Sequence, residues 1–317
     1  MASKLVYSEY GDPVKVVHKE NEEIPNPKEN EVLVKMLAAP VNPADVNTIE
    51  GKYPSKPPLP AVPGNEGVGK IIKVGPGVIE LSEGDHIVPL TNNLGTWRTH
   101  LILSRDNILK VPKKLGLVEA ATLTVNPCTA YRMLVVRMSF RFAVRGGVRS
   151  VNVVRARPDL AELKAFLVEL GANQVLTEEE VRTTDIFKSG KLEKPNLALN
   201  CVGGKSALEI MRHLQHGGTM VTYGGMSREP VTVPTSALIF KDIHVRGFWM
   251  TRWSKENSDT VDRMEMFEEL ISLMTSNDLQ GPKSQMVDFD NYKEALINTM
   301  TAKGMAGTKF ILNFDKS

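Results

Sequence analysis

Short apolar runs, broken by Pro, Gly, Asn and Asp, fill the first part of the chain. Runs of this kind are typical of β-strands joined by turns. They predict a β-rich region over residues 1–124. The expected strands lie in EVLVKMLAAPVN, GVGKIIKVG, GDHIVPL and THLILSRDNILKVP.

The pattern changes near residue 126, where helical spacing alternates with short β-branched runs. Asn126 and Pro127 predict a helix start, because asparagine caps helices and proline is tolerated in the first turn. The alternating segments are SVNVVRA, DLAELKAFLVELGANQVL, NLALNCVGG, SALEIMRHLQHGG and TMVTYGG. Such alternation predicts a parallel α/β sheet.

The last part of the chain returns to mixed texture and contains one further strand-like run, GTKFILNF. The whole pattern predicts an α/β protein in which one domain is inserted into another. The first, β-rich domain would comprise residues 1–124 and 256–317. The inserted nucleotide-binding domain would comprise residues 125–255, with a truncation near 134–150.

Composition and charge narrow the class of protein. The chain is 42% apolar and 24% charged, as in ordinary globular proteins. Its net charge of +2 gives no electrostatic case for nucleic acid. No apolar run reaches the roughly 18 residues of a membrane span. Two cysteines, Cys128 and Cys201, cannot form a four-thiolate zinc site and do not predict a disulfide framework.

The opening segment MASKLVYSEYGDP has neither a secretory apolar core nor an Arg- and Ser-rich presequence. It predicts a cytosolic protein, an isoform, or a mature form that has lost its presequence.

Arginines and glycines follow the predicted strands of the inserted domain, where ligands bind in parallel sheets. Arg155 and Arg157 come after the first of these strands. Arginine there favours the 2′-phosphate of NADP, whereas NAD sites have an acidic residue. Glycine pairs follow two later strands and would let a ligand approach the backbone: Gly203 and Gly204, and Gly224 and Gly225.

Several strings together resemble those of the mitochondrial trans-2-enoyl-CoA (enoyl thioester) reductases of the medium-chain dehydrogenase/reductase superfamily. The resemblance covers nearly the whole chain. Its strings include NPADVNTIEGKYPSKPPLPAVPGNEGVGKIIKVG, GTWRT, NPCTAYRML, NVVRARPD, ALNCVGGKS, GGTMVTYGGM and IFKDIHVRGFW.

The resemblance implies a GroES-like catalytic domain that holds an inserted Rossmann domain. It also implies a homodimer that reduces enoyl-CoA or enoyl-ACP with NADPH, in mitochondrial fatty acid synthesis. The compartment would then be the mitochondrion.

The family's site residues are implied position by position. Tyr53, in EGKYPS, would donate a proton or a hydrogen bond to the reacting thioester, since a tyrosine hydroxyl is protonated at neutral pH. The cofactor-binding residues would be Asn126, Arg155, Ala156, Arg157, Tyr223, Gly224, Gly225, Met226, Phe248, Trp249, Met250 and Lys309.

Zinc chemistry is not expected. Zinc-dependent members of the superfamily place Cys and His where this chain has Asn42 and Asn65, and asparagine is a poor zinc ligand. The nearby GNEGVG is not a dinucleotide turn, because it precedes a strand of the β-rich region.

The family pattern breaks between Met133 and Asn152. The first Rossmann strand, a glycine-rich turn and a helix belong there, and residues 134–151 are too few for all three. Arg137, Arg141, Arg145 and Arg149 recur every four residues instead. The sequence therefore predicts one helix over 126 to about 145, then a break at Gly146 and Gly147 leading into a strand near 151.

Three functions remain open. The first is an active NADPH-dependent enoyl thioester reductase. The second is a catalytically impaired variant with a binding or regulatory role, and the break favours it. The third is a zinc-free quinone reductase.

Overall fold

A computed structural model describes residues 1–91, 93–135, 148–301 and 307–315. The chain divides into two compact units. The first is Met1–Cys128 with Asn257–Ser317, and the second, Thr129–Glu256, is inserted between its halves. Each unit is described by itself.

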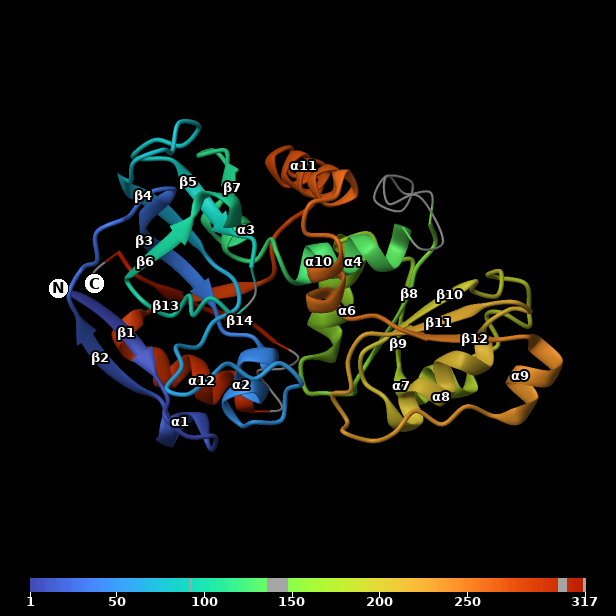
Figure 1. The fold of residues 1–317 in the computed structure, drawn as a ribbon. Helices are drawn as coiled ribbons and strands as arrows, with labels where there is room; N and C mark the ends of the chain where they lie inside the picture. The colour runs from blue at the N-terminus through green and yellow to red at the C-terminus, as the bar shows by residue number, and fades with distance from the viewer. Residues whose placement is uncertain (92, 136–147, 302–306, 316–317) are drawn as a thin grey trace. The chain divides into compact units, whose positions relative to one another are not determined.

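The first unit is built on a seven-stranded sheet, drawn in Figure 1. Its strands run in the order β13-β14-β3-β4-β5-β7, and β6 also pairs with β3. They are β3 (Glu31–Pro40), β4 (Val68–Val74), β5 (His86–Pro89), β6 (His100–Ser104), β7 (Ile108–Val111), β13 (Ser284–Asp288) and β14 (Lys309–Asn313). The four runs expected in residues 1–124 and the later run GTKFILNF are all confirmed as strands.

Shorter elements complete this unit. Strands β1 (Ala2–Val6) and β2 (His18–Glu22) form a separate antiparallel pair. The helices are α1 (Pro13–Val16), α2 (Pro43–Ile49), α3 (Leu117–Ala121), α11 (Val261–Thr275) and α12 (Tyr292–Met300).

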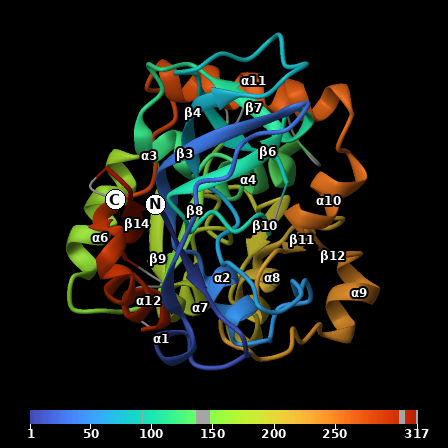
Figure 2. The ribbon, with the colours of Figure 1, turned by 60° about the vertical axis from the view of Figure 1, so that its left-hand side comes forward.

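The core of the first unit joins both halves of its sequence. Trp97 and Met36 are fully buried with Phe289 and Phe314, which come from the second half. Figure 2 shows α12 beside β14, and the two elements contact each other. Fully burying a side chain of this kind contributes roughly 1.5–3 kcal/mol. Apolar burial therefore holds the two halves together across the insertion.

The second unit alternates strands and helices, as the sequence predicts. Its strands are β8 (Val151–Val154), β9 (Gln174–Thr177), β10 (Leu197–Asn200), β11 (Thr219–Thr222) and β12 (His244–Gly247). Its helices are α6 (Leu160–Glu169), α7 (Glu178–Thr183), α8 (Gly204–His213), α9 (Thr235–Lys241) and α10 (Met250–Glu256). Helix α4 (Asn126–Val135) begins at Asn126 and crosses the unit boundary.

Local signals account for these boundaries. The chain turns out of α6 at Gly171, whose φ of 96° is a conformation that glycine adopts without strain. Helix α7 begins with a capping box, because the Thr177 hydroxyl accepts from the Glu180 N–H while Glu180 accepts from the Thr177 N–H.

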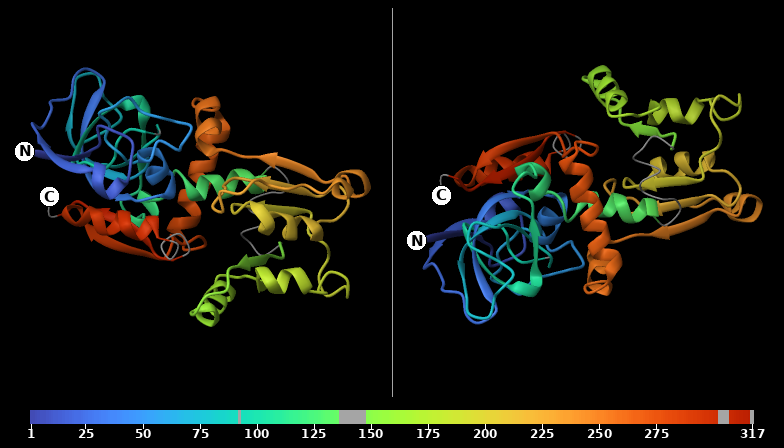
Figure 3. Two further views of the ribbon diagram at one scale, coloured as in Figure 1. Left: turned by 90° about the horizontal axis from the view of Figure 1, so that it is seen from below. Right: turned by 90° about the horizontal axis from the view of Figure 1, so that it is seen from above.

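The parallel strands of the second unit form two ladders. Strand β8 pairs with β9, while β10, β11 and β12 form a separate sheet. Among the residues that the structure describes, no strand pairing joins the two. Figure 3 draws them as separate ribbons, light green for β8–β9 and yellow to orange for β10–β12. In the usual strand order the first Rossmann strand lies between them, and residues 136–147, where the sequence predicts that this strand is missing, lie outside the described residues.

Helix α7 joins the two ladders. It contacts β8 and β9 on one side and α8 on the other. His213, on α8, makes a 2.8 Å hydrogen bond to the Val181 carbonyl of α7. The His213 ring also lies 5.1 Å from the ring of Phe187. Within the described residues, packing through α7 thus links the β8–β9 ladder to α8, which contacts β10.

The helix predicted over 126 to about 145 is confirmed as far as Val135. Residues 136–145 and Gly146–Gly147 lie outside the described residues. The predicted strand near 151 is confirmed as β8. A search of the described helices found none with the length and apolarity of a membrane span.

Candidate functional site

Three loops follow the carboxyl ends of β10, β11 and β12, and backbone hydrogen bonds tie them together. The Met226 N–H donates to the Cys201 carbonyl over 3.0 Å, and the Phe248 N–H donates to the Thr222 carbonyl over 2.9 Å. Ligands of parallel sheets bind at this edge. The structure brings seven predicted cofactor residues to it: Tyr223, Gly224, Gly225, Met226, Phe248, Trp249 and Met250.

The edge offers both open backbone and partly covered side chains. A Cβ built at Gly225 would meet no described atom within 4 Å, so a ligand can approach this backbone. Tyr223 is 40% exposed. Burial and the neighbouring Cys201 raise the pKa of its hydroxyl well above the usual range, which keeps it a hydrogen-bond donor. Met250 is buried and begins α10.

The predicted 2′-phosphate residues lie on the other ladder. Arg155, Ala156 and Arg157 directly follow β8, and Arg155 and Ala156 are exposed. Arg157 is half-buried, and its Nε lies 3.1 Å from the Asp159 carboxylate. The two groups of predicted cofactor residues therefore have separate strand frameworks in the described part of the chain.

Tyr53 lies in the first unit, in a loop that follows α2. We call residues 52–60 the Tyr53 loop. The Lys52 and Tyr53 N–H groups both donate to the Asn47 carbonyl of α2, over 2.8 and 3.1 Å. Farther along the loop, the Ser55 hydroxyl accepts from the Asn93 side chain over 2.5 Å.

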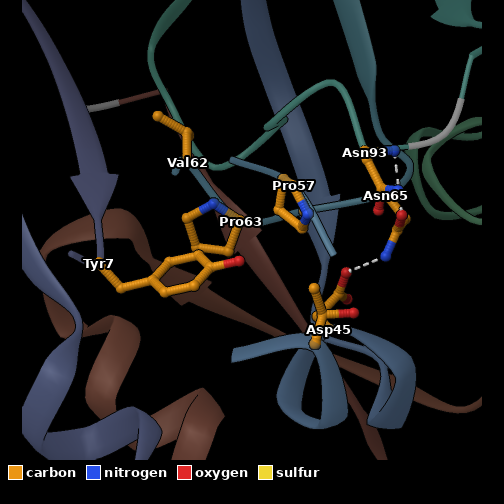
Figure 4. Close-up of a pocket in the computed structure, with 9 residues that line it drawn as sticks. Tyr7, Asp45, Pro57, Val62, Pro63, Asn65 and Asn93 are labelled. Atoms are coloured by element: carbon orange, nitrogen blue, oxygen red, sulfur yellow. Dashed lines mark hydrogen bonds between the residues drawn. The ribbon is translucent and has the colours of Figure 1, made fainter. Parts of the chain in front are cut away.

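Asn65, where zinc-dependent relatives place a ligand, belongs to a hydrogen-bonded frame in this chain. Its Nδ2 donates to Asp45 Oδ1 over 2.6 Å, and its Oδ1 accepts from the Asn93 N–H over 3.1 Å. Figure 4 shows both bonds, with Tyr7 and Pro63 across a small pocket from Asp45.

Asn42, at the other such position, also takes part. Its Nδ2 donates to Glu66 Oε1 over 2.9 Å, and its Oδ1 accepts from the Lys309 ammonium. The Asn42 N–H donates to Asp45 Oδ2 over 2.8 Å, which completes a capping box at the start of α2. Hydrogen bonds from Asn42 thereby hold the side chains of both Asp45 and Glu66 in place.

The two carboxyl groups are deeply buried, and burial dominates their acidity. Burial raises the pKa of Asp45 to about 7, against the opposing hydrogen bonds from Asn42 and Asn65. Burial also raises the pKa of Glu66, which the Lys309 charge and the Asn42 hydrogen bond oppose. Within the described residues, no three His, Cys, Asp or Glu side chains form a group that could hold a metal.

Two more predicted cofactor residues lie near this frame. Asn126 is the exposed first residue of α4, and the preceding Val125 N–H donates to Glu66 Oε2 over 3.0 Å. Lys309 begins β14 and reaches Asn42. Asn126, Lys309 and Tyr53 therefore belong to the first unit, and the remaining predicted site residues belong to the second.

Asp45, Glu66 and Asn93 were not predicted as site residues from the sequence. A signal for Asp45 was present, since Asn42-Pro43-Ala44-Asp45 has the spacing of a capping box. Glu66 stood in the GNEG string, but only the burial in the structure shows its importance. Asn93 has no local signal, because its partners are distant in sequence.

Two family models match the chain. The model described as "Alcohol dehydrogenase GroES-like domain" matches residues 28–113, and the model described as "Zinc-binding dehydrogenase" matches residues 138–269.

Relatives that match most of the chain share one description, "Enoyl-[acyl-carrier-protein] reductase, mitochondrial". The Rattus norvegicus protein is 46% identical over 323 residues, which cover 93% of this chain and 85% of its own length. The Xenopus tropicalis protein is 44% identical over 326 residues, covering 95% and 92%.

Several solved structures also match nearly the whole chain. A complex of Etr1p with NADP and crotonyl-CoA has a TM-score of 0.89 and 34% identity, and the match covers 99% of both chains. An Etr1p/Etr2p heterodimer from Candida tropicalis has the same TM-score, identity and coverage. A "putative NADPH:quinone reductase" from Bacillus thuringiensis has a TM-score of 0.84 at 26% identity, covering 99% of both chains.

Proposed function

This chain belongs to the mitochondrial enoyl-[acyl-carrier-protein] reductase family, and on that premise we propose that it reduces trans-2-enoyl thioesters with NADPH. The product is the saturated acyl thioester, and the process served is mitochondrial fatty acid synthesis. The observation that carries this function is identity of 44–46% to vertebrate reductases over more than nine-tenths of the chain. The quinone reductase match is weaker, at 26%.

Tyr53 has the central chemical role in this proposal. When bound, NADPH supplies the hydride that the β carbon takes up. Negative charge then develops on the thioester oxygen, and the α carbon must receive a proton. The Tyr53 hydroxyl either donates that proton or donates a hydrogen bond to the oxygen. The backbone bonds of Lys52 and Tyr53 to Asn47 hold the loop for this task.

The residues after β8, β11 and β12 would bind the cofactor. Arg155 and Arg157 offer charge-assisted hydrogen bonds to a 2′-phosphate. The open backbone at Gly225 suits the approach of the other end of the dinucleotide. The arginines would thus bind the 2′-phosphate end of NADPH, and the backbone at Gly225 would accommodate the other end.

Zinc does not fit the residues present. The amide oxygen of Asn42 accepts from the Lys309 ammonium, and Asn65 is engaged with Asp45 and Asn93. A divalent ion at Asn42 would face that ammonium, and amides are poor zinc ligands. No step of the reaction is therefore assigned to zinc. Zinc that copurified in stoichiometric amount, and whose chelation abolished reduction, would overturn this assignment.

The test is NADPH consumption by the purified chain with crotonyl-CoA, and with a benzoquinone in parallel. Reduction of crotonyl-CoA alone supports the proposal. Faster reduction of the quinone would point to the other reductase class.

The second candidate is a catalytically impaired member of the same family. The division of the parallel strands into two ladders favours it, because a pyrophosphate is normally held at the turn that follows the first Rossmann strand. NADPH titration by fluorescence, with NADH as the control, separates the two. Undetectable binding of either nucleotide would favour the impaired variant.

The assembly we propose is a homodimer. All four residues of β12 are exposed, and β12 forms the edge of its sheet in the described part of the chain. Beside it on α9, Leu238, Ile239 and Phe240 are 50%, 66% and 75% exposed. A second copy would pair with this edge and cover these side chains. Phe240→Glu should then shift the mass measured by light scattering from dimer to monomer, and an unchanged mass would exclude this interface.

The compartment we propose is the mitochondrion, which the descriptions of the relatives support. Imaging of the tagged full-length gene product would test it.

A further inference from the structure

We propose that Asn65 and Asn93 are positioning residues that hold the Tyr53 loop against α2. This inference rests on the proposed function, because it assigns the two amides a task in support of Tyr53. Neither side chain is expected to touch the substrate.

The contacts form a continuous chain of hydrogen bonds. Asp45 Oδ1 accepts from Asn65, Asn65 Oδ1 accepts from the Asn93 N–H, and Asn93 Nδ2 donates to the Ser55 hydroxyl. Ser55 lies two residues after Tyr53. This series of hydrogen bonds therefore starts at α2, the helix to which the Tyr53 N–H is bonded, and ends within the loop that carries Tyr53.

The Asp45 end of the chain is fixed. Asp45 is 1% exposed, and its second oxygen accepts from the Asn42 N–H. The Asn42 side chain is in turn held between Glu66 and Lys309. A displacement of Asn65 would leave a buried carboxyl oxygen without its donor, which is costly.

An amide is the group that suits the position of Asn65. It presents a donor to Asp45 and an acceptor to the Asn93 N–H at the same time. A carboxylate in its place would face the Asp45 carboxyl, and an alanine would lose both bonds. In this chain the Asn65 side chain joins α2 to the segment that contains Asn93.

The backbone conformation at residue 93 is one that asparagine adopts readily. Its φ is 60°, a left-handed conformation that asparagine tolerates better than most residues and glycine adopts freely. Asn93→Gly therefore keeps the backbone and removes only the bond to Ser55. Asn30 has the same φ of 60° on an exposed turn, so Asn30→Gly is a matched control.

The kinetic test is a double-mutant cycle with Tyr53→Phe. Misplacement of a catalytic group by about 1 Å can lower the rate roughly 100-fold, so Asn65→Ala and Asn93→Gly should lower kcat by about 10- to 100-fold. The KM for NADPH should stay unchanged. In the Tyr53→Phe background the same changes should have less than about a twofold effect, because residues that act as a unit are not additive. An equal loss in both backgrounds would show a merely structural role.

Amide hydrogen exchange tests the inference without turnover, and so separates its failure from failure of the proposed function. Asn93→Gly should accelerate exchange of the Lys52 and Tyr53 N–H groups by roughly tenfold, because local opening becomes easier. The Tyr7 and Ala61 N–H groups, which bond to each other's carbonyls, should be unaffected. Asn30→Gly should change neither pair. Unchanged exchange at Lys52 and Tyr53 in both Asn65→Ala and Asn93→Gly would overturn the proposal, whether or not the chain reduces crotonyl-CoA.

Discussion

The two units of this protein differ in how completely their sheets are connected. In the first unit one seven-stranded sheet is covered by fully buried side chains such as Trp97, Phe289 and Phe314. In the second unit the described strands form two ladders, and all four residues of β8 are only half-buried. Helix α6, all of it within the described residues, contains no buried side chain, and Phe166 on it is 41% exposed.

Tyr53, the proposed proton donor, and most of the predicted cofactor residues lie on separate frameworks. The frame around Tyr53 depends on contacts within the first unit only, and it is intact. Most of the predicted cofactor residues follow strands of the second unit, and the described strands there form two ladders. On the roles proposed above, we expect this chain to retain the chemistry of its family and to bind the cofactor weakly.

Tyr53→Phe tests the first unit and should have the largest effect of the four changes. It keeps the ring and removes the hydroxyl, so loss of a positioned acid should slow turnover by roughly 10²- to 10⁴-fold. NADPH binding should barely change. Tyr10→Phe is the control, because the Tyr10 hydroxyl touches the same loop at the Pro57 carbonyl. An unaltered rate in Tyr53→Phe would refute the assignment.

The buried carboxyl of Asp45 should make the first unit sensitive to pH. Its pKa of about 7 exceeds its usual value of 3.8, so the folded state retains a proton that the unfolded state releases. Stability should therefore fall as the pH rises from about 4 to about 7 and level off above that, by at most roughly 4 kcal/mol.

Asp45→Asn should flatten this dependence, measured as the free energy of unfolding in urea at pH 5 and pH 8. Glu66, whose pKa is raised in the same direction, should leave a residual slope. Asp106→Asn, on an exposed side chain, is the control. An identical slope in Asp45→Asn and the wild type would contradict the prediction.

The second unit, whose described strands form two ladders, is tested by insertion of a family-type strand, glycine turn and helix between Leu134 and Ser150. Two charge-assisted bonds to the pyrophosphate, at about 1.5 kcal/mol each, would raise NADPH affinity by roughly 100-fold. The inserted strand should also raise thermal stability by pairing β8 with β10. A glycine–serine insert of equal length is the control. Tight NADPH binding by the unaltered chain would show that its site for the pyrophosphate was never lost.

Arg155→Ala should have the smallest effect of the four. Loss of one or two charge-assisted bonds, about 1.5–3 kcal/mol, should weaken NADPH binding by roughly 10- to 100-fold and leave NADH binding unchanged. Arg182→Ala, exposed on α7 of the same unit, is the control. Equal affinity for both nucleotides in the wild type would remove the basis for cofactor selection.

Local patterns in the sequence predicted most of the elements. The strands of the first unit and the alternation of the second follow from apolar periodicity and from breaker residues such as Gly171. The short helix α2 was missed, although its cap at Asn42 is visible in the sequence. The organisation of the second unit into two ladders could be suspected from the shortened segment after Met133, but the pairing itself depends on tertiary contacts.

The candidate site was predictable only in part. Resemblance proposed roles for Tyr53 and the strand-end residues, because they occur in continuous strings, and these roles stay predictions. The frame of Asp45, Asn65 and Asn93 joins residues far apart in the chain, and its meaning depends on burial. Sequence patterns do not report which polar side chains meet in the interior.

The position of Lys309 has a consequence for synthesis on the ribosome. Its strand, β14, pairs with β3, but the whole inserted unit is translated between them. A nascent chain that has reached Glu256 holds α2 and the Tyr53 loop, yet it lacks the ammonium beside Asn42 and the buried Phe289 and Phe314. Contacts so distant in sequence form late, because a long loop must close first. The frame around Tyr53 is therefore completed only after the second unit has emerged, and a truncated translation product would carry Tyr53 without Lys309, Phe289 and Phe314.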